Sequence, residues 1–169
     1  LEGHPWFKLA AVAASERSAG MSLGEALHDR KTGALRWWAS SEPPAAFLKL
    51  PVTLARDLPL DRLDLVFTAV ESDAAREIEP EIARRLPVFS TASAFRMEAD
   101  VPLIVAGVNP EQAPLVEVQR KKRGWKGFVV PIPNCTVTGL AVVLKALDLK
   151  FGVKNVVVYV DNPSRPVGT

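Results

Sequence analysis

Short apolar runs recur along this chain and alternate with segments whose apolar residues have helical spacing. The runs lie at residues 8–15, 64–70, 86–90, 101–106, 128–133 and 155–160. They lack the alternation of apolar and polar residues that a half-exposed strand shows, so they predict parallel strands buried on both faces. The segment at residues 21–58, by contrast, has Gly, Pro and Ser punctuation and indicates no clear order of elements.

Helical spacing is clearest in two segments. In the first, Ser72 is placed to cap a helix whose apolar stripe comprises Ala75, Ile78, Ile82 and Leu86. Pro80 lies inside that stripe, so we expect it to kink or restart the helix. The second helix follows Cys135, and a third helix is expected at residues 111–118. Strands and helices in alternation predict an α/β fold with a largely parallel sheet and helices on both faces.

Functional loops of such a fold lie at the carboxyl ends of its strands. Ser15, Ala69, Ser90 and Cys135 all fall at predicted strand ends. Cys135 is the only cysteine, and it lies where a strand gives way to a helix. The N–H groups and the positive end of a helix favour the reactive thiolate, so we interpret Cys135 as a catalytic nucleophile rather than a small buried apolar residue. Asn134 and nearby backbone N–H groups are candidate oxyanion donors.

Composition narrows the functional classes. The chain has 169 residues, of which 48% are hydrophobic and 24% charged, as in one globular domain with a large core. A net charge of +2 is too low to predict a nucleic-acid partner. A single cysteine forms no internal disulfide, and no apolar run has the length of a membrane span, so a cytoplasmic protein is expected. Residues 1–5 resemble the tail of a helix and residues 161–169 close no element, so we expect a fragment truncated at both ends.

Several charged residues have two interpretations each. Arg17 and Ser18, with Ser15, follow the first strand, where an Arg with serines suits the 2′-phosphate of a dinucleotide; a solvated turn is the alternative. Arg96 either binds a phosphate or carboxylate or is a solvated loop residue. The cations at residues 120–126 form either a solvated basic turn or, less in keeping with the net charge, a nucleic-acid patch. His4 and His28 are expected at the surface, so no general base is assigned.

The order of these motifs resembles the aspartate-semialdehyde dehydrogenase family in its archaeal and fungal branch. The resemblance rests on Ser-Glu-Arg-Ser at residues 15–18, Ser-Ala-Phe-Arg-Met at residues 93–97 and Asn-Cys-Thr at residues 134–136, and it extends over about residues 1–158. It implies a Rossmann-like NADP-binding domain at residues 1–134, incomplete at its N-terminus. Residues 135–169 would then begin a catalytic and dimerisation domain, with Asn162 near the position of a substrate-orienting Gln.

The resemblance also implies roles for individual residues. Cys135 would be the acylated thiol, and Arg96 and Asn134 would bind the phosphate or acyl group. The cofactor NADP would contact six residues: Ser15, Arg17, Ser18, Thr68, Ala69 and Ser72. The implied reaction is reductive dephosphorylation of aspartyl phosphate to the semialdehyde, with release of phosphate, in lysine, methionine and threonine biosynthesis.

The implied partners are a small acyl phosphate or aldehyde and a second copy of the full-length protein, without nucleic acid or membrane. The alternatives are a malonyl-CoA reductase or other acyl reductase on the same scaffold, and a non-catalytic remnant or interaction domain. In any of these cases we expect the 169 residues to be inactive alone as a dehydrogenase.

Overall fold

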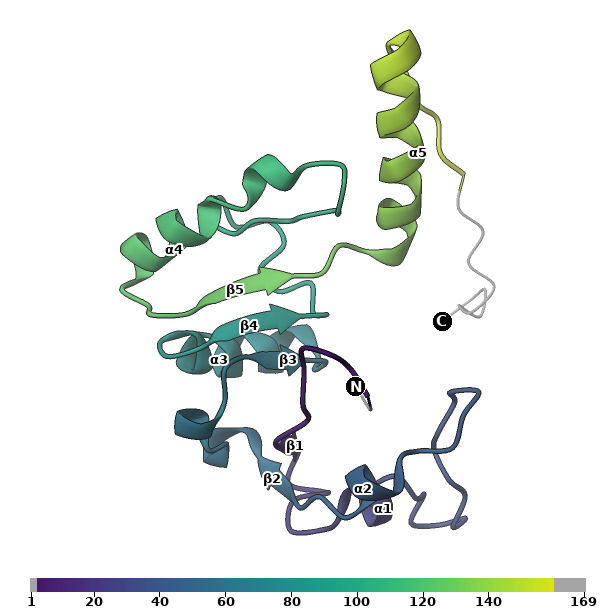
Figure 1. Ribbon diagram of the computed structural model, residues 1–169, viewed down its shortest axis with the longest axis vertical. Coiled ribbons are helices and arrows are strands. Elements are labelled where there is room, and N and C mark those ends of the chain that lie inside the picture. Colours follow the sequence, from purple (N-terminus) through teal and green to yellow (C-terminus); the bar gives the residue numbers. More distant parts are fainter. Residues whose placement is uncertain (1–2, 160–169) are drawn as a thin grey trace.

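The computed structural model describes residues 3–159, and its strands form two parallel sheets. In the first sheet, β1 (Val12–Ala14) pairs with β2 (Val52–Leu54). In the second, β4 (Pro87–Ser90) lies between β3 (Val66–Thr68) and β5 (Phe128–Pro131). Figure 1 shows the smaller sheet below the larger one. The predicted α/β fold with parallel strands is confirmed.

The helices that connect the strands of the larger sheet are α3 (Ser72–Ala83) and α4 (Leu115–Arg123). α3 contacts all three strands, whereas α4 contacts β5. The remaining elements are α1 (Leu23–Ala26), α2 (Ala45–Leu48), η1 (Ala55–Asp57), η2 (Leu60–Arg62), η3 (Pro110–Gln112) and α5 (Cys135–Phe151). Within residues 3–159, no helix combines the length and the apolarity that crossing a lipid bilayer requires.

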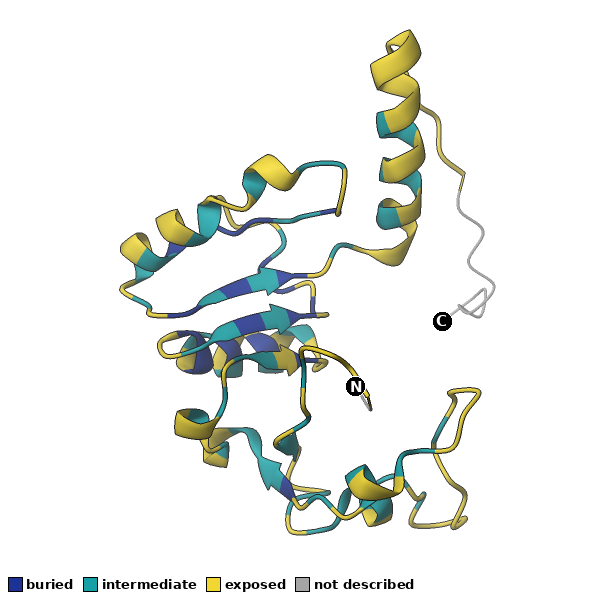
Figure 2. Cartoon of the chain, in the orientation of Figure 1, coloured by how far each residue is buried: buried dark blue, intermediate teal, exposed yellow. Residues whose placement is uncertain are grey.

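The two faces of the larger sheet are packed differently. On one face, Val88 and Val129 are fully buried against Ala75 and Ile82 of α3. Figure 2 shows that the buried residues gather in β4, β5 and α3. The other face has a row of aromatic rings from Phe67, Phe89 and Phe128, with neighbouring ring centroids 5.7 and 5.9 Å apart. Phe67 is 54% exposed, so α3 supplies most of the helical cover in the part of the chain that the structure describes.

A cavity of about 680 Å³ separates the two sheets. Ala13 of β1 lines one side and Val66 and Phe67 of β3 line the other, with Ile78 and Ile82 of α3 also at its wall. Among the described residues, β1 pairs only with β2 and β3 pairs only with β4, so the facing edges of the two sheets are unpaired. The largely parallel sheet that the sequence predicts is therefore divided at this point.

Helix α3 differs in detail from the prediction. Glu71, with φ −61° and ψ 153°, is the N-cap residue, and no side chain caps the helix, so Ser72 is its first residue rather than its cap. The helix also continues through Pro80 without restarting. Proline at this position removes one backbone donor, but Ile82 and Ala83 beyond it are buried in the core and hold the last turn in place. Leu86 lies beyond the helix end.

Two predicted strands are wrong. The segment at residues 101–106 is extended, but the side chains of Asn109 and Gln112 bond its backbone in place of a neighbouring strand. Residues 155–159 form no strand, because no described strand lies beside them to pair with. Residue 160, Asn162 and the remaining C-terminal residues lie outside the described part of the chain, as do residues 1–2.

The helix expected at residues 111–118 is split and shifted. The short η3 precedes it, and α4 extends to Arg123, so residues 120–123 are its last turn rather than a basic loop. Cations there complement the negative end of the helix dipole. Gly124 follows with φ 67°, a left-handed conformation that glycine adopts without steric cost and that ends the helix.

Candidate active site

Cys135 is the first residue of α5 and is exposed. The predicted strand-to-helix position is confirmed, since only three residues separate β5 from the helix. Asn134 is the N-cap: its Oδ1 accepts a hydrogen bond from the N–H of Thr136 at 2.9 Å. The hydroxyl of Thr138 donates to the carbonyl oxygen of Asn134 at 3.0 Å. The cap uses the acceptor Oδ1 and leaves the Nδ2 amide, the only donor of the Asn134 side chain, to bind a ligand.

The carboxyl ends of the three strands of the larger sheet are aligned. Thr68 is paired in register with Ser90, and Ser90 with Pro131. The three segments that follow these residues therefore leave the sheet at the same edge. They carry Ser72, Arg96 and Cys135, all of which the sequence placed in the site. The hydroxyl oxygens of Ser72 and Ser93 lie 2.8 Å apart, which ties two of these segments together.

Arg96 joins the other two segments. Its Nε donates to the carbonyl oxygen of Ile132 at 3.1 Å, and its Nη2 donates to that of Thr91 at 3.0 Å. The residue is partly buried, and these two bonds hold its guanidinium against the backbone of two segments. A guanidinium has five N–H donors, and donors remain for an anion after these two bonds.

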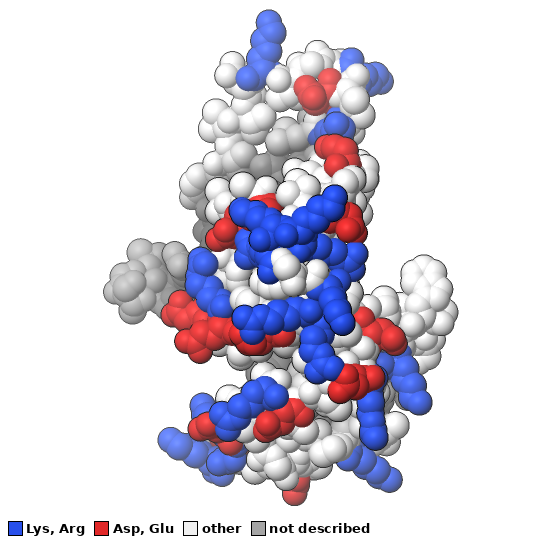
Figure 3. Space-filling view, turned by 90° about the vertical axis from the view of Figure 1, so that its left-hand side faces the viewer, with Lys and Arg blue, Asp and Glu red and all other residues white. Residues whose placement is uncertain are grey.

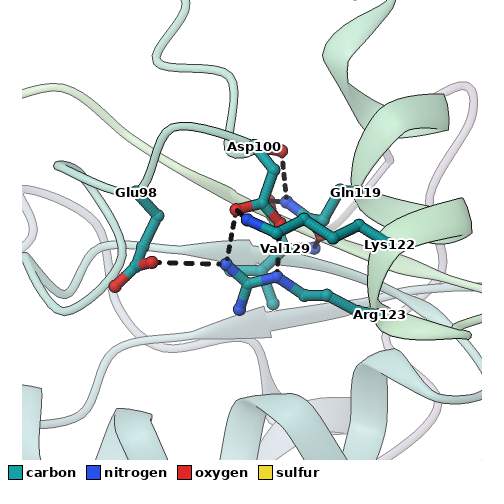
Figure 4. Close-up of polar contacts among 6 residues, drawn as sticks. All are labelled: Glu98, Asp100, Gln119, Lys122, Arg123 and Val129. Carbon is teal, nitrogen blue, oxygen red and sulfur yellow. Dashed lines mark hydrogen bonds and ion pairs between the residues drawn. The ribbon is translucent and has the colours of Figure 1, made fainter.

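An ion cluster around the buried Asp100 holds the end of the loop that carries Arg96 (Figure 4). Asp100 is 3% exposed, and its carboxylate accepts from Arg123 at 2.5 and 3.0 Å and from Lys122 at 3.1 Å. These bonds, Arg123 first, hold the pKa of Asp100 well below its usual range. The side-chain amide of Gln119 accepts a hydrogen bond from the N–H of Val129 and donates one to the carbonyl oxygen of Val129. It thereby pairs backbone groups of β5 on the edge of the strand that faces away from β4. Sequence reasoning missed this cluster, because its members are far apart in the chain.

A second cavity, of about 620 Å³, lies after β1. Its lining includes three residues that the sequence grouped together, Ser15, Arg17 and Ser18. It also includes three cations that the sequence did not single out: Arg30, Lys31 and Arg36. The carboxylate of Asp29 in its wall already accepts from the N–H groups of Thr32 and Lys31, which lower its pKa to about 2. Among the described residues, Arg17 and Lys31 form no ion pair.

The structure does not gather every predicted residue in one place. Ser15, Arg17 and Ser18 line the second cavity, whereas Thr68 and Ala69 line the cavity between the sheets. Both groups nevertheless lie at the carboxyl ends of strands, β1 and β3 respectively. The hydroxyl of Thr68 points into the protein, where it donates to Glu79.

The two histidines are exposed, as expected. Nδ1 of His4 accepts from the N–H groups of Trp6 and Phe7, and Nδ1 of His28 lies 2.8 Å from the carbonyl oxygen of Gly24. His28 also lines the second cavity. These contacts are local, and none of them involves Cys135.

Comparison with known proteins gives a consistent match. The family model described as "Semialdehyde dehydrogenase, NAD binding domain" matches residues 1–115. The aspartate-semialdehyde dehydrogenase of Methanothermobacter thermautotrophicus is 39% identical over 158 residues, which cover 94% of this chain and 43% of that protein. The aspartate-semialdehyde dehydrogenase of Archaeoglobus fulgidus is 43% identical, with 92% and 43% covered.

The match extends to a solved structure and to a relative with another name. The crystal structure of the Candida albicans aspartate semialdehyde dehydrogenase with NADP has a TM-score of 0.73 and 34% identity, covering 89% of this chain and 42% of that one. The malonyl CoA reductase (NADP) of Metallosphaera sedula is 30% identical, with 94% and 42% covered. The chain thus spans about two fifths of the length of these relatives. The predicted Rossmann-like fold is confirmed.

Proposed function

Because the chain belongs to the semialdehyde dehydrogenase family through its NAD binding domain, we propose that it is part of an NADP-dependent aspartate-semialdehyde dehydrogenase. The observation that carries the proposal is the position of Cys135. It is exposed at the start of a 17-residue helix, next to the segments that carry Ser72 and Arg96. An exposed cysteine sulfur at this position can reach a bound acyl group, and cysteine is a nucleophile of acyl transfer.

In the proposed reaction, the sulfur of Cys135 attacks the carbonyl carbon of aspartyl phosphate, and phosphate leaves to give a thioester. The Nδ2 amide of Asn134 and the backbone N–H groups at the start of α5 stabilise the oxyanion. Arg96 binds the phosphate with the donors that its two carbonyl bonds leave over. Bound NADPH would supply a hydride to the thioester carbon, and cleavage of the C–S bond would release the semialdehyde and return the sulfur of Cys135 as the leaving group.

The second cavity fits the 2′-phosphate of NADP by the chemistry of its donors. Ser15 and Ser18 provide hydroxyls, and Arg17 and Lys31 are cations without acidic partners among the described residues. The wall also contains two acidic residues, Asp29 and Glu25. Asp29 is bonded to the N–H groups of Lys31 and Thr32 and to Arg36, and Glu25 is bonded to Ser22, so both oppose an incoming phosphate less. We assign Ser15, Arg17 and Ser18 to the 2′-phosphate, and Thr68, Ala69 and Ser72 to the remainder of the cofactor. The Candida albicans structure, which was solved with NADP, supports the choice of cofactor.

We infer that residues 1–134 form the NADP-binding domain and that residues 135–169 begin the catalytic and dimerisation domain. The support is that α5 extends away from both sheets in Figure 1. Its apolar side chains, such as Val143 and Leu149, are exposed. Since the chain spans about two fifths of the length of its relatives, the activity belongs to the protein at its full natural length, as a homo-oligomer, rather than to these residues alone.

The relative from Metallosphaera sedula supports a second candidate, a malonyl-CoA reductase that forms the same kind of thioester. The deciding experiment follows NADPH oxidation by the full-length protein with aspartyl phosphate and with malonyl-CoA. Turnover with aspartyl phosphate that is lost in Cys135→Ser supports the proposal, and turnover with malonyl-CoA alone supports the second candidate. If neither substrate reacts and Cys135 is alkylated no faster than free cysteine, the chain is a non-catalytic relative.

A further inference from the structure

Glu79 is a buried carboxyl group beneath the candidate site. It lies on α3 and is 0% exposed, although its neighbours on the buried face of the helix, Ala75, Ile82 and Ala83, are apolar. Its Oε1 accepts two hydrogen bonds, from the hydroxyl of Thr68 at 2.5 Å and from the hydroxyl of Ser90 at 2.6 Å. Thr68 and Ser90 are the last residues of β3 and β4 and are paired in register. One oxygen atom therefore holds two adjacent strand ends.

The hydrogen bonds continue from these strand ends into the loops. The N–H of Ala92 donates to the hydroxyl oxygen of Ser90 at 3.0 Å, and the N–H of Thr91 donates to the carbonyl oxygen of Thr68 at 2.9 Å. The N–H of Ile132 donates to the carbonyl oxygen of Ser90 at 2.6 Å. Ile132 lies three residues before Cys135, and its carbonyl oxygen in turn accepts a hydrogen bond from Arg96. A continuous set of bonds thus links Glu79 to all three segments of the site.

A carboxyl group at this position carries a cost in stability. The second oxygen of Glu79, Oε2, is buried and has no hydrogen-bond partner among the described residues. A buried polar atom without a partner is costly, and an apolar side chain in a helix that faces a sheet avoids the cost. The polar side chain is explained if its Oε1 has to fix the orientation of the two hydroxyls.

We propose that Glu79 is a positioning residue. It fixes the position of the segment after β3, which carries Ser72, relative to the segments after β4 and β5, which carry Arg96 and Cys135. Thr68 lies beside the cofactor in the proposed function, and Arg96 and Cys135 lie beside the acyl phosphate. The proposal rests on that function for its catalytic consequence, whereas its structural content, the coupling of the segments, stands on the bonds to Thr68 and Ser90. Removing Oε1 releases both strand ends at once.

The test compares three variants of the full-length protein: Glu79→Leu, Glu79→Gln and Val88→Ala. Leu removes the acceptor, whereas Gln keeps an oxygen that can accept both hydroxyls. Val88→Ala is the matched control, because it weakens the core two residues before Ser90 without touching any bond to Glu79. Urea unfolding of each variant gives the loss of stability against which the other measurements are compared.

The first readout is amide hydrogen exchange of residues 69–72 and 91–97, which needs no ligand. At equal loss of stability, Glu79→Leu is expected to raise exchange in both segments by about tenfold over Val88→Ala, the effect of roughly one hydrogen bond. Glu79→Gln should stay near the wild-type protein. Equal exchange in Glu79→Leu and Val88→Ala at matched stability would overturn the proposal.

The second readout separates this proposal from the proposed function. With NADPH and aspartyl phosphate, Glu79→Leu should lower kcat by about tenfold or more, because misplaced segments are felt in the transition state. In a protein that already has Thr68→Val and Ser90→Ala, adding Glu79→Leu should change kcat little, since the coupled groups are already absent. A full additional loss there contradicts the positioning role. If the wild-type protein neither binds nor oxidises NADPH, the proposed function fails, and the exchange measurement still decides the coupling by Glu79.

Discussion

Arg96 donates a hydrogen bond to the carbonyl oxygen of Ile132 at 3.1 Å, and Ile132 lies three residues before Cys135. A second bond, to the carbonyl oxygen of Thr91, fixes the other side of the guanidinium. The side chain that would bind the phosphate therefore also holds the segment that leads to the thiol. In the proposed function, substrate binding and the placement of Cys135 therefore depend on the same cation.

We expect Arg96→Lys to impair both properties. A single ammonium group cannot reproduce two bonds that diverge from a planar fork. The KM for aspartyl phosphate should rise and kcat should fall, each by about tenfold, and both are measured by steady-state NADPH oxidation. Arg76→Lys, an exposed change on α3, is the control and should behave like the wild-type protein. Unchanged kinetics in Arg96→Lys would remove Arg96 from the site.

Asn134 has two separable functions, a helix cap through Oδ1 and a proposed oxyanion donor through Nδ2. Asn134→Ser keeps a capping oxygen but lacks the amide, so unfolding stability should be retained while kcat falls by about a hundredfold. Asn134→Ala should lose kcat and also about 1 kcal/mol of unfolding free energy. Urea unfolding and steady-state kinetics on both variants test this. If Asn134→Ser retains full activity, the amide is not an oxyanion donor.

The position of Cys135 could be predicted from the sequence because the signals for it are local. An apolar run, an Asn that can cap a helix, and apolar residues at helical spacing lie within a short stretch of chain. The capping bond from Thr136 to Asn134 spans two residues. Such contacts do not depend on how the rest of the chain is folded.

Glu79 could not be predicted, because a glutamate within an amphipathic helix is ordinarily solvent-facing. Its burial depends on hydroxyls from two strands, each 11 residues away in the chain. The prediction of a strand at residues 101–106 was wrong for a related reason. An apolar run does not reveal whether its backbone will bond to a neighbouring strand or, as here, to the side chain of Asn109. The separation of β1 from β3 likewise depends on pairing between distant segments, which residue patterns do not specify.

Asp100 makes unfolding stability depend on acid pH. Its pKa is lowered by Arg123, desolvation opposes that effect, and Lys122 adds to it. Because the folded pKa lies below the usual value of 3.8, the unfolded chain takes up the proton first as the pH falls. The stabilisation is therefore complete well above that value and is lost progressively as the pH falls through the folded pKa.

Asp100→Asn should accordingly lower the unfolding free energy at neutral pH by about 3 kcal/mol, because it leaves the partly buried Arg123 without its main partner. The difference between unfolding free energies at about pH 7 and about pH 3 should also be smaller in the variant than in the wild-type protein. Urea unfolding at the two pH values measures both effects. Glu77→Gln, an exposed change on α3, is the control. An equal pH difference in the two variants would contradict the assignment.

Arg17 should determine the preference for NADP over NAD. It lines the second cavity with Ser15 and Ser18 and has no acidic partner among the described residues, so its charge is available to the 2′-phosphate. In the full-length protein, Arg17→Ala should raise the Kd for NADPH by about tenfold or more, the effect of losing a charge-assisted bond, and leave the weaker Kd for NADH unchanged. Quenching of intrinsic fluorescence on titration measures both constants. Lys49→Ala removes an exposed cation that lines neither cavity and should change neither constant. An equal loss of affinity for both nucleotides in Arg17→Ala would show that Arg17 supports the fold of the loop and does not contact the 2′-phosphate.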